Sequence, residues 1–115
     1  MKLLKLIVLF MLPVLGFGQT LKVGSELTVV HFNAGWNSAA DVKWVKSLEE
    51  CKIKYCDIAS DTKAQNKYDI VVVPTIIVFY EGEEVKRFQA DISFAMKATL
   101  EEVQEVISET KADSF

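Results

Sequence analysis

Runs of apolar and β-branched residues mark four segments of the chain as predicted β-strands. Residues 27–32 and 75–80 are almost uninterrupted runs of this kind, which is typical of strands buried on both faces. Residues 53–58 form another strand. The fourth predicted strand, residues 85–88, follows the third after the turn Glu81-Gly82, so these two strands are expected to form a hairpin.

Between the first two strands, apolar positions recur at a spacing that predicts an amphipathic helix. Ser38, with Asp41 three residues later, has the pattern of a helix start. The apolar residues that follow are expected to form one face of this helix, with charged residues mostly elsewhere: Val42, Val45 and Leu48.

Two further helices are predicted from capping residues and apolar spacing. Asp61 is expected to cap a short polar helix over residues 62–68. Thr99 and Glu102 have the spacing of a capping box, and one apolar face follows them: Leu100, Val103, Val106 and Ile107.

The predicted order of elements is therefore β, α, β, α, β, β, α, which indicates an α/β protein. Strands separated by helices are expected to pair in parallel, and the closing hairpin must be antiparallel. The pattern thus predicts a central mixed β-sheet with helices on both faces.

Residues 1–18 have the features of a secretory signal peptide. Lys2 and Lys5 precede an apolar run, residues 6–15, and Gly16-Phe17-Gly18 supplies small residues for cleavage. The run is short for a membrane span, which needs about 20 residues, although an uncleaved anchor is the alternative. We expect one mature domain, residues 19–115, that is secreted or periplasmic.

The charge balance bears on which partners this domain has. The chain carries 13 basic and 16 acidic residues, and removal of Lys2 and Lys5 leaves 13 − 2 = 11 against 16, a net charge of −5. An acidic protein is repelled by nucleic acid and by anionic membranes. We therefore expect no nucleic-acid partner, and no membrane partner once the signal peptide is removed.

Two short segments carry a resemblance to a known family. Trp36-Asn37-Ser38-Ala39-Ala40 follows the first predicted strand, and Val73-Pro74-Thr75 begins the third. In this order and at about this separation they resemble the thioredoxin family, in which the first segment reads Trp-Cys-Gly-Pro-Cys. The resemblance extends over nearly all of residues 23–107. It implies a thioredoxin-like fold with a cis-proline at Pro74 facing the loop that contains Trp36.

The chemistry of that family requires two thiols at the first segment. One thiolate attacks a disulfide and the second thiol resolves the mixed disulfide that results. In the alignment Asn37 takes the attacking position and Ala40 the resolving position, and neither side chain is a nucleophile. The sequence therefore predicts a redox-inactive domain with no catalytic residues, and an enzymatic role is not expected.

The two cysteines and the single histidine lie elsewhere. If residues 51–56 are extended, Cys51 and Cys56 are about 16 Å apart, too far for a disulfide, and point to opposite faces of the sheet. Cys56 is expected to pack as a small apolar residue, while Cys51 is expected to be partly exposed and is a candidate for pairing with another chain. His31 takes the place of a buried aspartate in similar thioredoxins, as either a neutral buried group or a pH sensor. These three residues do not form a metal site, and no cofactor is expected.

Three functional interpretations follow. The first is a protein- or peptide-binding domain whose groove lies between residues 36–40 and residues 73–75, with Trp36 as one wall and the Val73 backbone as a strand-like partner. The second is a thiol oxidoreductase or isomerase component that uses Cys51 or the cysteines of a partner. The third is a structural interaction domain that uses the loop over residues 89–98, with Phe94 and Met96.

Overall fold

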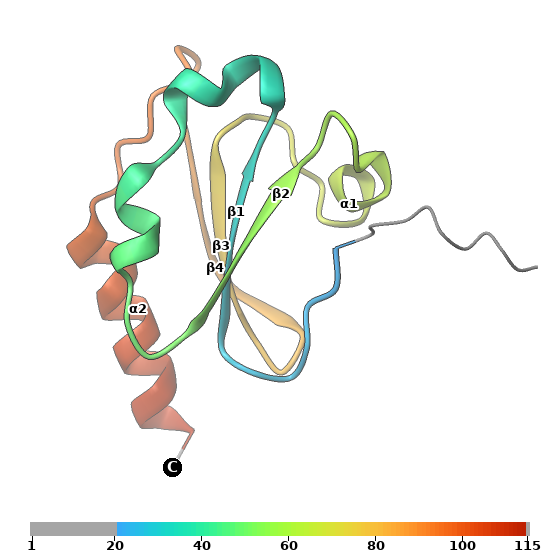
Figure 1. Ribbon diagram of the computed structural model, residues 1–115. Coiled ribbons are helices and arrows are strands. Elements are labelled where there is room, and N and C mark those ends of the chain that lie inside the picture. The colour runs from blue at the N-terminus through green and yellow to red at the C-terminus, as the bar shows by residue number, and fades with distance from the viewer. Residues whose placement is uncertain (1–20, 115) are drawn as a thin grey trace, which may run out of the picture.

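A four-stranded sheet forms the centre of the protein in a computed structural model that describes residues 21–114 (Figure 1). The predicted signal peptide, residues 1–18, lies outside the described residues. The strands are arranged in the order β2-β1-β3-β4, and their bounds are Thr28–Asn33 for β1, Lys52–Asp57 for β2, Thr75–Tyr80 for β3 and Glu83–Gln89 for β4. All four strands predicted from the apolar runs are present.

The sheet is mixed, as predicted, but one strand direction differs from the expectation. β1 pairs in parallel with β2 and antiparallel with β3, and β3 pairs antiparallel with β4. The expectation that strands separated by helices pair in parallel is therefore wrong for β3. Helix α1 (Thr62–Lys67) has six residues and rises about 9 Å, whereas a six-residue strand spans about 20 Å. Because α1 cannot return the chain along a full strand, β3 begins at the end of the sheet where β2 finishes.

Helices cover both faces of the sheet, which confirms the predicted architecture (Figure 1). Alternate residues of β1 point to opposite faces. Val30 and Phe32 pack in one core with residues of α1 and the segment that follows it. Val29 packs in the other core with helix α2 (Leu100–Asp113) and with the segment after β1.

The capping residues of α1 and α2 act as predicted. The Asp61 side chain accepts a hydrogen bond from the Ala64 N–H at 3.0 Å, at the start of α1. At the start of α2, Thr99 and Glu102 form the full capping box, in which each side chain accepts from the other residue's backbone N–H.

The helix predicted after Ser38 does not form as one continuous α-helix. Two short 3₁₀ helices are present instead, η3 (Gly35–Ala40) and η4 (Lys43–Ser47), separated by Asp41 and by Val42, which is extended. Ser38 lies inside η3, the N-cap is Ala34, and no side chain caps it. The apolar positions 42, 45 and 48 repeat every three residues, which fits the three residues per turn of a 3₁₀ helix better than the 3.6 of an α-helix.

No helix within residues 21–114 combines the length and apolar character needed to cross a membrane.

Candidate functional site

The two segments singled out in the sequence lie at the same end of the sheet. Phe32, near the end of β1, pairs with Thr75 at the start of β3, so η3 and Pro74 both leave the sheet at this end (Figure 1). The Val73–Pro74 peptide bond is cis. The Ala90 N–H donates to the Pro74 carbonyl at 3.0 Å, which holds the start of β3 against the end of β4.

The two segments offer a partner different groups. Trp36 is 69% exposed, Ser38 and Ala39 are exposed, and Asn37 and Ala40 are half-buried. The side chains of the second segment are buried: Val73, Pro74 and Thr75. Within the described residues, neither the N–H nor the C=O of Val73 takes part in a hydrogen bond. The first segment thus exposes an indole ring, whereas the second has unpaired backbone groups on Val73, a residue that is 3% exposed.

Asn33, which sequence reasoning missed, holds the loop in place. Its buried side-chain Nδ2 donates to the Asn37 carbonyl at 3.0 Å and to Asp41 Oδ1 at 2.6 Å. Asn37 returns the contact, because its Nδ2 donates to Asn33 Oδ1 at 3.0 Å. The residue at the attacking position is therefore part of a hydrogen-bond network that fixes η3. Two asparagines four residues apart, at the point where a buried strand ends, are the only signal of this network in the sequence.

The loop after β4 meets the loop after β1. The ring of Phe94 lies edge-on to the ring of Trp36, with 5.8 Å between their centroids. Phe94 is 42% exposed, and Ile92 in the same loop is 95% exposed. We call these three residues, Trp36, Ile92 and Phe94, the Trp36–Phe94 surface. Trp36, which the sequence assigned to the predicted groove, and Phe94, which it assigned to the alternative 89–98 loop, are therefore in contact.

Asp91 gives the second loop its shape. Its Oδ1 accepts hydrogen bonds from the Ser93 N–H at 2.8 Å, the Ser93 hydroxyl at 2.6 Å and the Ala95 N–H at 3.2 Å. These bonds hold the pKa of Asp91 at about 2, since they favour the ionised carboxylate. Phe94 has a φ of 66°, in the left-handed region that is uncommon for aromatic residues. The loop thus holds Phe94 in a defined position beside Trp36.

His31 of β1 is buried and contacts the segment between η3 and η4. Its Nε2 accepts a hydrogen bond from the Val42 N–H at 3.0 Å, between η3 and η4. Burial lowers the pKa of His31, and the nearby Asp41 carboxylate opposes this shift without cancelling it. The imidazole is therefore neutral near pH 7, with Nε2 as an acceptor.

A cavity of about 190 Å³ lies on the side of η3 that faces β2. It is lined by residues of β1, β2 and the loop, including His31, Asn33, Asp41 and Tyr55. Ser38 alone of the predicted groove residues lines it, so it is not the predicted groove.

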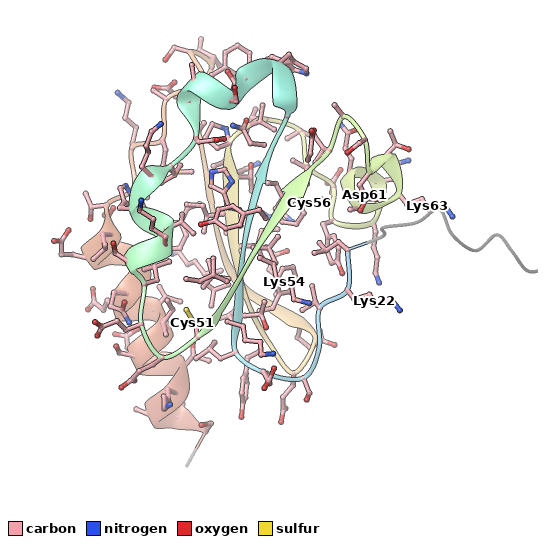
Figure 2. The ribbon with its side chains drawn as sticks, viewed as in Figure 1. Lys22, Cys51, Lys54, Cys56, Asp61 and Lys63 are labelled. Carbon is pink, nitrogen blue, oxygen red and sulfur yellow. The ribbon has the colours of Figure 1, made fainter. Side chains whose placement is uncertain are left out.

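Both cysteines are free and lie on opposite faces of the sheet, as expected (Figure 2). Cys56 is buried, and its pKa is raised to about 11 by burial first and then by Asp61 and Asp57. Cys51 is half-buried, and burial raises its pKa as well. Neither thiol is appreciably ionised at pH 7, and ionisation is what a nucleophilic thiol needs. Within the described residues, no group of His, Cys, Asp or Glu is placed to hold a metal ion.

Comparison with known proteins finds similarity at the level of structure. No family model and no curated protein sequence matches the chain. Thioredoxin from Fasciola hepatica is 27% identical with a TM-score of 0.54, over 75% of this chain and 82% of that one. Thioredoxin 1 from Thermosipho africanus is 17% identical with a TM-score of 0.56, over 76% and 97%. Thioredoxin from Schistosoma mansoni is 23% identical with a TM-score of 0.54, over 74% and 77%. The chain is therefore an α/β domain with the thioredoxin-like fold.

Proposed function

We propose that this protein is a redox-inactive thioredoxin-like domain that binds a protein or peptide in extended form. The observation that carries the proposal is the exposed ring of Trp36 at the same end of the sheet as the unpaired backbone groups of Val73. An extended chain would pair with Val73 as an added strand while its apolar side chains contact the Trp36–Phe94 surface. We expect binding to occur outside the cytoplasm, after removal of residues 1–18.

The absence of exchange chemistry is the second part of the proposal. Asn37 and Ala40 take the positions that need thiols, and Asn37 is engaged with Asn33. Cys51 and Cys56 are poor substitutes because burial raises the pKa of both. No feature of the described residues favours the alternative role as an oxidoreductase component that works through Cys51.

Reduction of insulin by dithiothreitol tests this part. We expect the purified protein to leave the rate of insulin precipitation at the uncatalysed background. The Asn37→Cys, Ala40→Cys double variant is the matched positive control, since it places thiols at the attacking and resolving positions. We expect this variant to raise the rate above background. Turnover by the unmodified protein that is lost in Cys51→Ser would establish the oxidoreductase interpretation instead.

Binding is tested with random peptides displayed on phage and selected against the protein. For a selected peptide, fluorescence anisotropy should show that Trp36→Ala weakens binding by about 30-fold, the usual effect of losing a central aromatic contact. Phe94→Ala should weaken it less, because that ring is more buried in the protein's own loop. Val85→Ala is the matched control, since Val85 is an exposed apolar residue of β4 that takes no part in the surface. Equal affinities for the protein and Trp36→Ala would locate binding away from the groove.

A further inference from the structure

The outer edge of β2 is open within the part of the chain that the structure describes. β2 is the first strand in the sheet order and pairs only with β1. The Lys52 N–H donates to the Leu27 carbonyl, and the Ile58 N–H donates to the Asn33 carbonyl. Along a strand, successive residues direct their backbone N–H and C=O groups to opposite sides. These two bonds show that the backbone groups of even-numbered residues of β2 face β1. The N–H and C=O groups of Ile53 and Tyr55 and the N–H of Asp57 therefore point away from the sheet.

A hollow of about 230 Å³ adjoins this edge and has an acidic character. It is lined by Tyr55, Cys56 and Asp57 of β2 and by Leu21, Ser60 and Asp61. Asp57 and Asp61 both raise the pKa of the Cys56 thiol in addition to the effect of burial, which reports their negative potential at this point. The hollow is thus suited to receive a cationic side chain.

The cation that would fit the hollow stands on the same strand. Lys54 is a half-buried residue two positions before Cys56, on the same face of the sheet, and its ammonium group donates to the Lys22 carbonyl in an exposed hydrogen bond (Figure 2). The first half of β2 therefore carries Lys52 and Lys54, and its end carries Asp57 with Asp61 close by. A strand with this polarity is complementary to itself only when two copies run antiparallel.

We propose that two copies of this protein pair through their β2 edges in antiparallel register, with Lys54 of each copy entering the acidic hollow of the other. Tyr55 is placed opposite Tyr55 of the second copy, and the two residues exchange both backbone hydrogen bonds. The Asp57 N–H of each copy donates to the Ile53 carbonyl of the other. Lys54 then lies directly opposite Cys56, next to Asp61. The alternative register that centres on Lys54 places two lysines face to face and is disfavoured.

The other edge of the sheet is less suited to pairing. The ladder between β3 and β4 is interrupted by an irregularity at Val78 and Phe79, which twists the strand. β2 and β4 form the two opposite edges of the sheet, so pairing through β2 does not involve β4.

Sedimentation equilibrium over a range of protein concentrations tests the pairing. We expect a reversible dimer, and we expect Lys54→Glu to raise its dissociation constant by about tenfold or more, because both attractive contacts become repulsive. Lys86→Glu makes the same charge change at the β4 edge and should leave the dimer unchanged. A monomer at every concentration, or equal effects of the two variants, would overturn the proposal.

The register is tested separately by disulfide trapping. In the Cys51→Ser background, Lys54→Cys should form an intermolecular disulfide with Cys56 under mild oxidation, since directly opposed residues of this kind lie about 4.5 Å apart between Cα atoms. Lys52→Cys, which is placed opposite Ile58, should not form it. Non-reducing electrophoresis and mass spectrometry of the linked peptides identify the pair. Equal trapping of both cysteines would exclude this register.

Discussion

Replacing Phe32 with alanine is expected to lower the free energy of unfolding by about 3–5 kcal/mol, the usual cost of removing a buried aromatic ring. Phe32 is 0% exposed and packs in the core between the sheet and α1. Its ring centroid lies 5.8 Å from that of Tyr68. Because a domain of this size has a total stability of about 5–15 kcal/mol, the variant is expected to be marginally folded. Urea denaturation followed by circular dichroism measures the change.

Phe94→Ala provides the matched control, since it removes the same side chain from a partly exposed position. Phe94 lies in the loop after β4 and contacts Trp36 at the surface. We expect the Phe94→Ala substitution to lower the free energy of unfolding by less than about 1 kcal/mol, although it also weakens peptide binding. Equal losses of stability from the two variants would show that Phe94 is a core residue and would remove the basis for an exposed binding surface.

The features that the sequence predicted correctly depend on contacts close in the chain or on a single repeating pattern. The strands appear as apolar runs because β1 and β3 lie at the centre of the sheet with both faces covered. Asp61 and Thr99 were recognisable as caps because a cap contacts backbone only three residues away. The α/β class and the helices on both faces followed from the alternating order of strands and helices along the chain.

Some of the features that were wrong or missed depend on distant contacts, whereas the Asn33–Asn37 network and the division of the first helix are local. The direction of β3 depends on how far the short helix α1 carries the chain, which apolar spacing does not encode. The contact between Trp36 and Phe94 joins two loops that are far apart in sequence. The three-residue spacing of the apolar positions already indicated 3₁₀ rather than α-helical structure in this segment. The position of the break at Val42, however, is fixed by the hydrogen bond from the Val42 N–H to His31 on β1.

The stability of the protein is expected to fall as the pH is lowered below 6.5, because His31 is held neutral in the folded state. Burial lowers the pKa of His31 below its ordinary value of 6.5, whereas the unfolded chain binds a proton at the ordinary value. Between these two pKa values the unfolded state binds more protons, so the free energy of unfolding decreases by up to about 1.4 kcal/mol for each unit of pH. Above pH 6.5 this contribution is fully present and does not change. Urea denaturation at a series of pH values from 8 to 5 measures it.

His31→Gln separates this effect from the titration of carboxylates. Glutamine retains a side-chain oxygen that can accept from the Val42 N–H, and it does not titrate. Since His31 is the only histidine in the chain, the variant should lose the slope that begins as the pH falls below 6.5, while it keeps the loss of stability caused by protonation of carboxylates. A slope that persists in His31→Gln would assign the effect to another group.

The contact between His31 and Val42 also predicts which part of the chain becomes less ordered when His31 is protonated. A protonated imidazole has no acceptor atom for the Val42 N–H, so the break between η3 and η4 loses its side-chain anchor. Asp41 next to Val42 also accepts from Asn33, the residue that holds Asn37 and therefore the loop with Trp36. As the pH is lowered and His31 becomes protonated, hydrogen exchange should accordingly become faster at residues 34–42 than expected from the intrinsic rate, while β3 and α2 change only with global stability. Uniform acceleration over all elements would mean that His31 acts on the whole fold and does not set the order of this loop.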